Sequence, residues 1–188
     1  MERRWYTIQI DGITPLVMHN PQSMLAQAEA NPRDKGAWER EHYQEMLYRR
    51  DEDRLYVPAA ALKKMLMAGC KFIPDKPKRF LSFSPFLDAS MLIDEDALLD
   101  VPLALVKPWG AVVNLDPSKG PRGPRGIRTR PLISPPWHAE TSALVWEELL
   151  TTEILQKIAE TAGLSCGLLD ARSLGYGRCT VGIVPRGR

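Results

Sequence analysis

The sequence contains few cysteines and few histidines, and their positions argue against metal sites and disulfide bonds. The cysteines are three in number, widely spaced and without a C-x-x-C pair, so we expect buried thiols and not a disulfide framework or a zinc site. The histidines, His19, His42 and His138, also lack the spacing of metal ligands. We therefore expect no metal and no other cofactor.

Long apolar runs are absent as well. No segment is long and apolar enough to cross a bilayer, and the N-terminus has no apolar signal-peptide core. These two observations predict a cytoplasmic protein without a membrane partner.

A strong net charge is missing, since 25 basic residues oppose 23 acidic ones. The distribution of charge is more informative, because the stretch 117–130 carries no acidic residue. Its basic residues are Lys119, Arg122, Arg125, Arg128 and Arg130. Such segregation builds a local positive surface. The repeated Gly-Pro-Arg is too short for a collagen helix and favours a flexible basic loop that becomes ordered on nucleic acid. A solvated loop without a ligand is the alternative.

Periodicity predicts the secondary structure. Alternating or apolar runs predict strands at 5–10, 13–18, 54–57, 80–93, 140–146 and 178–184. Leu62, Met65, Leu66 and Gly69 form one apolar face of a helix that begins near Pro58. A second helix begins at Thr151 or Thr152 and is expected to end at Gly163.

Two segments look like insertions into this pattern. Residues 22–50 favour charged surface helices interrupted at Asn31-Pro32, and residues 94–137 are rich in proline and glycine and are expected to add little to the core. Without them the order is βαββαβ, so we predict a single α+β domain with a ferredoxin-like, RRM-like core.

A glycine-rich loop precedes the last strand. It runs from Gly163 to Arg178 and places Tyr176 between Gly175 and Gly177. Glycines let the backbone approach a ligand closely and offer N–H groups to phosphate oxygens, while Arg172 and Arg178 supply positive charge. A loop that merely needs positive φ is the alternative.

This loop resembles the C-terminal glycine-rich loop of the RAMP superfamily. The segment Leu55–Lys63 resembles a second landmark of that family, a short strand and a proline that open the first core helix. The chain departs from the family pattern at Leu169, where a glycine is common, and at Ala59 and Ala60. The resemblance is to the backbone-subunit branch of CRISPR effector complexes, or to a phage or mobile-element relative.

The resemblance implies a subunit that holds single-stranded RNA, in particular a guide RNA, with insertion 94–137 as a thumb-like element. Single-stranded DNA or a target strand is a further possible ligand, and copies of the chain or related subunits are the implied protein partners. The residues then expected to bind RNA are Lys63, Lys64, Lys119, Arg122, Arg125, Arg128, Arg130, Arg172, Gly175, Tyr176, Gly177 and Arg178. Trp109, Trp137 and Tyr176 are candidates for stacking on unpaired bases.

Two alternatives to a non-catalytic RNA-binding subunit stay open. One is a metal-independent endoribonuclease that processes CRISPR RNA with His19 as general acid or base. The resemblance also makes Asp11 and Asp34 candidates for the loop aspartate with which some backbone subunits cleave their target, and a turn is the simpler role for Asp11. The other alternative is a phage structural or interaction protein.

Overall fold

The larger sheet of the protein has seven strands in the order β10-β1-β9-β6-β4-β3, with β5 also paired to β9. The computed structural model describes residues 3–30, 34–51, 53–73, 83–114, 118, 122–148 and 150–186. The strands of this sheet are β1 (Arg3–Gly12), β3 (Arg49–Arg50), β4 (Arg54–Val57), β5 (Met91–Ile93), β6 (Ala97–Leu99), β9 (His138–Trp146) and β10 (Cys179–Pro185).

The order of the elements is ferredoxin-like. Helix α3 (Ala59–Gly69) connects β1 and its insertion to β5 and β6, and helix α5 (Thr152–Ser165) connects β9 to β10. Strand β9 lies between β1 and β6, and β1 lies between β9 and β10, with every one of these pairs antiparallel. Both βαβ units are therefore split by an intervening strand, which confirms the predicted α+β, ferredoxin-like core.

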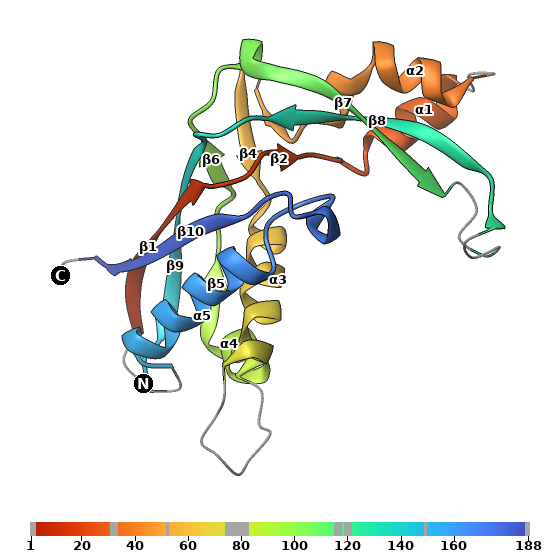
Figure 1. Cartoon of the computed structure of the whole chain (residues 1–188). Helices are drawn as coiled ribbons and strands as arrows, with labels where there is room; N and C mark the ends of the chain where they lie inside the picture. Colours follow the sequence, from red (N-terminus) through yellow and green to blue (C-terminus); the bar gives the residue numbers. More distant parts are fainter. Residues whose placement is uncertain are drawn as a thin grey trace.

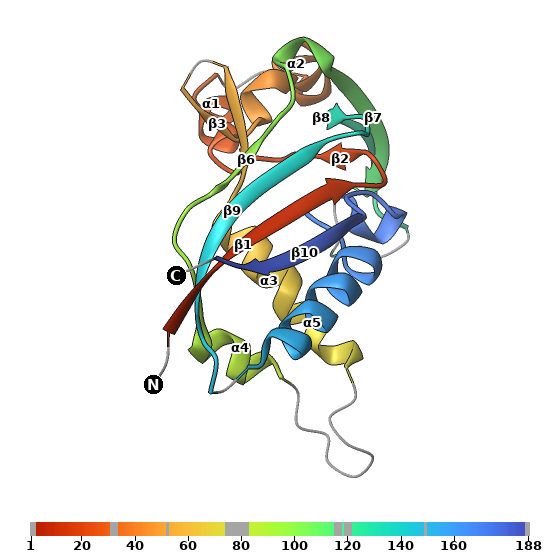
Figure 2. The ribbon, with the colours of Figure 1, turned by 90° about the vertical axis from the view of Figure 1, so that its left-hand side faces the viewer.

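Both core helices pack on one face of this sheet (Figures 1 and 2). Along β1 the side chains of Tyr6, Ile8 and Ile10 are fully buried beneath the helices, and those between them point to the other face. The predicted apolar face of α3 is buried as expected. The two helices cross closely at Gly69, where a Cβ would lie 2.5 Å from the Ala162 Cβ.

A second, three-stranded sheet in the order β2-β8-β7 stands beside the core. It consists of β2 (Leu16–Val17), β7 (Val106–Asn114) and β8 (Arg125–Ile133), and β7 and β8 form a long hairpin (Figure 1). The prediction of a flexible basic loop is thus wrong for Arg125, Arg128 and Arg130, which lie in a strand. Pairing with β7 along nine residues supplies their backbone hydrogen bonds.

The first insertion packs against this hairpin. Helices α1 (Ser23–Ala30) and α2 (Lys35–Glu41) are confirmed as helices, and α2 and the following 3₁₀ turn contact β8. The expectation that both insertions lie outside the core is wrong, because they bury apolar side chains in the main cluster. These are Leu47, Val101, Val106, Ile133 and Trp137.

Two local predictions also differ from the structure. Part of the extended run expected at 80–93 forms helix α4 (Ser84–Ser90), and only β5 is a strand, while Phe80 lies outside the described residues. Helix α5 continues past Gly163 to Ser165, because Gly163 serves packing and not termination: a Cβ there would lie 2.3 Å from the Cys179 carbonyl oxygen. The short 3₁₀ turns are η1 (Tyr43–Met46), η2 (Cys70–Phe72), η3 (Leu103–Leu105) and η5 (Arg172–Leu174).

Candidate nucleic-acid interface

A polar pocket lies where β2, α3 and the glycine-rich loop meet. It is lined by His19, Tyr48, Ala61, Lys64, Leu169, Asp170 and Arg172, and we call it the His19 pocket. His19 follows β2, Lys64 lies on α3 and Arg172 begins the η5 turn after α5. Three residues predicted as functional, from three distant segments, therefore share one pocket.

The glycine-rich loop is held in place by the segment that leads into β2. The Asp170 N–H donates to the Val17 carbonyl at 3.1 Å, which positions Asp170 beside His19. At the other end of the loop, the Arg178 N–H donates to the Thr14 hydroxyl, which itself donates to the Gly175 carbonyl. The glycine-rich loop is thus docked onto the segment 14–17, largely through its own backbone.

The backbone N–H groups that were expected to bind phosphate are already hydrogen-bonded within the protein. The Gly177 N–H donates to the Pro15 carbonyl at 2.8 Å, and the Gly175 N–H donates to the Arg172 carbonyl at 3.0 Å. The prediction of a phosphate cradle at these two amides is therefore wrong, and the alternative of a loop that needs positive φ fits better. Both glycines have positive φ, +87° at Gly175 and +71° at Gly177.

A buried glutamate connects the two insertions. Glu39 on α2 is 2% exposed and accepts hydrogen bonds from the Arg128 guanidinium and from the Thr129 N–H. Arg130 lies 3.3 Å from the same carboxylate. Two of the predicted RNA-binding arginines therefore have an internal partner, which fixes β8 against α2.

The charge network continues into the His19 pocket. Arg130 Nε lies 3.9 Å from the Asp170 carboxylate, and His19 Nδ1 lies 4.0 Å from the same oxygen. Burial and then the nearby positive charge of Arg130 lower the pKa of His19, and Asp170 opposes this only in part. Because its ordinary value is about 6.5, His19 is mainly neutral at pH 7.

A second basic groove runs between α2 and β8. Its lining residues are Asp34, Lys35, Gly36, Arg40, Gly126, Ile127 and Arg128. Asp34 has a structural task here, because its carboxylate accepts from the Gly36 and Ala37 N–H groups and caps α2. Arg128 lines this groove and contacts Glu39, so the charge network joins the groove to the His19 pocket.

The neighbouring lysines of α3 have different surroundings. Lys64 lines the His19 pocket, whereas the Lys63 ammonium lies 2.8 Å from the Asp88 carboxylate and donates to the Asp88 carbonyl. Of the other basic candidates, Arg122 and Arg125 are exposed near the end of the hairpin, and Lys119 lies outside the described residues. One nitrogen of Arg178, Nη1, is buried and has no hydrogen-bond partner within the described residues.

The aromatic candidates are mostly engaged within the protein. Trp137 is 2% exposed and its indole N–H donates to the Thr14 carbonyl, so its prediction as a base-stacking residue is wrong. Trp109 on β7 and Tyr176 in the glycine-rich loop contact each other with ring centroids 4.9 Å apart. Asp11 is the penultimate residue of β1, and its carboxylate lies 2.8 Å from His138 Nδ1. In the described residues no three His, Cys, Asp or Glu side chains form a metal-binding group.

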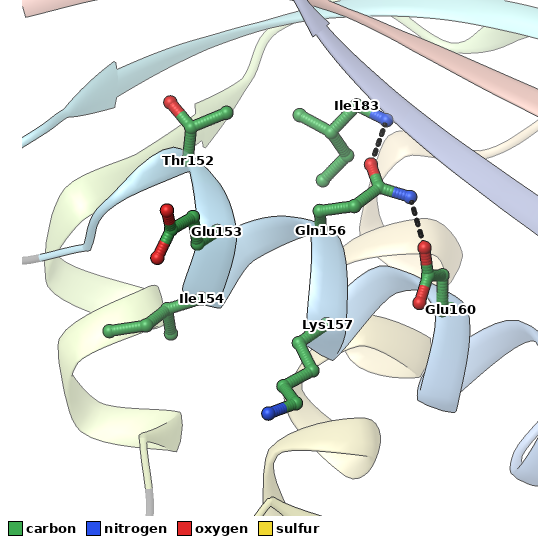
Figure 3. Close-up of a pocket in the computed structure, with 7 residues that line it drawn as sticks. All are labelled: Thr152, Glu153, Ile154, Gln156, Lys157, Glu160 and Ile183. Carbon is green, nitrogen blue, oxygen red and sulfur yellow. Dashed lines mark hydrogen bonds between the residues drawn. The ribbon is translucent and has the colours of Figure 1, made fainter.

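A further pocket, at the edge of the sheet, has a structural explanation (Figure 3). It lies between α5 and β10 and is lined by Thr152, Glu153, Ile154, Gln156, Lys157, Glu160 and Ile183. The Gln156 amide accepts from the Ile183 N–H at 2.8 Å and donates to the Val181 carbonyl and to Glu160. Gln156 thereby replaces a missing neighbour strand along the open edge of β10.

Sequence reasoning missed the acidic members of the interface and Tyr48. Glu39 stands in a charged helical segment that looked solvent-exposed, and its only local sign is the neighbouring Trp38, which is also buried. Asp170 lies in the glycine-rich loop, whose basic residues alone carry the charge that predicts a ligand. Neither position has a local signal that reveals its partner, because those partners are far away in the sequence.

A comparison with one solved structure agrees with this architecture. A chain of the type III-B Cmr-β complex, a complex solved bound to its cognate target RNA, matches with a TM-score of 0.58 and 13% identity over 98% of this chain. At this identity the match shows that the two chains share a fold.

That match covers 61% of the Cmr-β chain, so this protein spans less than two thirds of its length. Cmr6 from Pyrococcus furiosus also matches, with a TM-score of 0.48 and 13% identity over 96% of this chain and 99% of Cmr6. No protein-family model and no curated protein matches the sequence. Among the described residues, no helix has the length and apolar character needed to span a membrane.

Proposed function

We propose that this protein is a non-catalytic RNA-binding subunit of a CRISPR-type ribonucleoprotein. It would hold a single-stranded guide RNA in the cytoplasm and assemble along it with copies of itself or related subunits. The whole chain would act as one RAMP-like domain, with the β7–β8 hairpin as its thumb-like element.

The observation that carries the proposal is the meeting of Lys64 and Arg172 beside His19 in one polar pocket. Lysine and arginine are the usual partners of phosphate oxygens, and such contacts dominate the affinity for nucleic acid. The groove between α2 and β8 adds Lys35 and Arg40 as a second group of basic residues. The exposed Arg122 and Arg125 extend this surface toward the end of the hairpin.

The test compares neighbouring lysines on one helix. We expect the double variant Lys64→Ala/Arg172→Ala to bind single-stranded RNA at least about tenfold more weakly, because two charge-assisted contacts are removed. The slope of log affinity against log salt should become shallower by about 1.4, since two fewer phosphates are neutralised. Fluorescence anisotropy at several salt concentrations measures both quantities.

Lys63→Ala is the matched control, because Lys63 is paired with Asp88 and does not line the pocket. Its affinity and salt slope should equal those of the wild type. If Lys64→Ala/Arg172→Ala keeps the wild-type salt slope, the His19 pocket is not the RNA site. The same titration with single-stranded DNA shows whether the surface distinguishes RNA from DNA.

A second candidate function is RNA cleavage, and the environment of His19 is the observation that favours it. The lowered pKa keeps the imidazole neutral at pH 7, as a general base requires, and Lys64 and Arg172 line the same pocket to stabilise developing negative charge. Cleavage should then rise with pH through the lowered pKa, level off above about 6.5, persist in chelator and vanish in His19→Ala.

Incubation of an RNA with the protein, followed by measurement of cleavage and of binding, distinguishes these functions. Intact RNA at all pH values, together with tight binding, supports the non-catalytic subunit. Neither cleavage nor binding would favour a protein-interaction role of the kind found in phage structural proteins.

A further inference from the structure

The open face of the larger sheet carries two tryptophans that neither core helix covers. Figure 2 shows β9, β1 and β10 toward the viewer, with α3 behind them. Because Tyr6 and Ile8 point to the helices, the alternate residues Trp5 and Thr7 lie on the open face. Trp5 is 43% exposed, which is unusual for so large an apolar side chain in the middle strands of a sheet.

The second tryptophan lies diagonally across from the first. In the β1–β9 register Trp5 is opposite Leu144 and Arg3 is opposite Trp146. Diagonal neighbours of this kind lie about 7–8 Å apart, within reach of large rings on the same face. The two indoles and Leu144 therefore form one apolar strip near the chain termini.

Positive charge surrounds this strip. The Arg3 guanidinium lies 5.1 Å from the centre of the Trp146 ring, and the Arg186 N–H donates to the Trp5 carbonyl. The Arg186 side chain turns onto the same face, since its Nε donates to the Thr7 hydroxyl at 3.0 Å. No described acidic side chain occupies the open-face positions between these two arginines.

The opposite end of the same face is acidic and internally paired. Gln9 donates to Glu140, and Asp11 contacts His138. An anionic strand is therefore favoured at the tryptophan end and disfavoured at the other end. The charge distribution therefore favours an anionic partner, and the exposed indole rings favour a partner with flat groups that are free to stack on them.

We infer that this strip, which we call the Trp5 platform, binds bases of a single-stranded nucleic acid. RRM domains use the same face of the same βαββαβ core, where aromatic residues on the first and third strands stack two or three bases. Here Trp5 lies on the first core strand and Trp146 on the third, with arginines placed for the phosphates. The site is separate from the His19 pocket, so the protein has two surfaces for single strands.

The test uses a short oligo(A) RNA carrying 2-aminopurine, whose emission reports stacking directly. Trp5→Ala and Trp146→Ala should each weaken binding about 5- to 150-fold, which is the range for one lost base–aromatic stack. Trp5→Phe keeps an aromatic ring and should stay within a few fold of wild type. Leu92 on β5 is opposite Leu144, at the border of the platform, and has no aromatic ring. The matched control Leu92→Ala therefore removes apolar area without removing a base stack, and it should leave affinity and 2-aminopurine emission unchanged.

Two further measurements distinguish this site from the His19 pocket: the dependence of affinity on salt, and the effect of Trp5→Ala in a protein that also carries Lys64→Ala/Arg172→Ala. The loss caused by Trp5→Ala should leave the salt slope unchanged and should persist in the Lys64→Ala/Arg172→Ala variant, because distant sites are additive. If Trp5→Ala and Trp5→Phe both bind and quench like wild type in either background, the platform does not exist, whatever the pocket variants do. If Lys64→Ala/Arg172→Ala binds like wild type while Trp5→Ala binds weakly, the His19 pocket is not an RNA site and the Trp5 platform is.

A protein partner is the competing occupant. Sedimentation of the wild type, Trp5→Ala and Leu92→Ala tests it without RNA. Self-association that both variants abolish, with unchanged affinity for oligo(A), would overturn the platform in favour of a docking surface between copies. Melting temperatures of each variant identify any loss that is due to unfolding, and Trp5→Phe tests stacking where Trp5→Ala does not fold.

Discussion

Gly175 and Gly177 lie in one loop and both have positive φ, yet a side chain would meet different surroundings at each. A Cβ on Gly177 would lie 2.1 Å from the Leu168 carbonyl oxygen, whereas a Cβ on Gly175 would have no atom within 4 Å. Left-handed backbone costs a non-glycine residue about 1–2 kcal/mol, and overlap with backbone adds to that cost. A substitution at Gly175 therefore adds backbone strain alone, whereas a substitution at Gly177 adds both strain and steric overlap.

We predict that Gly175→Ala lowers the free energy of unfolding by about 1–2 kcal/mol and Gly177→Ala by about 2–4 kcal/mol. Urea denaturation measures both. Gly175→Ala should also keep its RNA affinity, because the amide of this residue already donates to Arg172. Lost affinity in a Gly175→Ala protein of normal stability would restore the phosphate cradle at this loop.

The elements of the two insertions depend on each other. Neither α2 nor the β7–β8 hairpin belongs to the ferredoxin-like core, and Glu39 holds them together through Arg128, Arg130 and the Thr129 N–H. A charge at 2% exposure is stable only while its partners remain. The basic groove between α2 and β8 thus depends on one carboxylate.

Glu39→Gln should lower the free energy of unfolding by about 2–3 kcal/mol, because two partly buried arginines lose their counter-charge. Limited proteolysis should cut the hairpin before the core. Glu41→Gln, an exposed position on the same helix, is the matched control and should change stability by less than about 0.5 kcal/mol. Equal stability of Glu39→Gln and Glu41→Gln would show that packing alone holds the hairpin.

The molecule as a whole is built around one core that contains two of its three free thiols. Cys70 and Cys179 are buried, and burial raises the pKa of Cys70 to about 11 and of Cys179 to about 12. Cys166, after α5, is partly exposed. The thiolate is the form that reacts with alkylating reagents. Labelling of the two buried thiols therefore measures global unfolding, whereas labelling of Cys166 measures the accessibility of its side chain in the folded protein.

We predict that iodoacetamide at pH 8 modifies Cys166 in the native protein and reaches Cys70 and Cys179 only at the rate of global unfolding. Mass spectrometry of labelled peptides gives the three rates, and Cys166→Ser should leave the native protein unlabelled. Fast native labelling of Cys179 would contradict the burial of its side chain beneath α5.

The sequence by itself determined the core. Period-two and helical patterns are local, so β1, β9, β10 and the buried face of α3 were predictable from residues that lie next to one another in the chain. The glycine-rich loop and the segment before α3 carried the RAMP resemblance for the same reason. Lys64, Arg172 and His19 were recognised as polar groups beside these landmarks.

The tertiary structure decided what the insertions do. The basic segment 125–130 becomes part of strand β8 only because β7 pairs with it, and Glu39 is buried only because β8 brings two arginines to it. Trp137, a candidate for base stacking, is buried instead because Gly12 leaves room for its ring, with a Cβ site 2.1 Å from the indole. Each outcome depends on partners far along the chain, and no local pattern encodes which distant segments will meet.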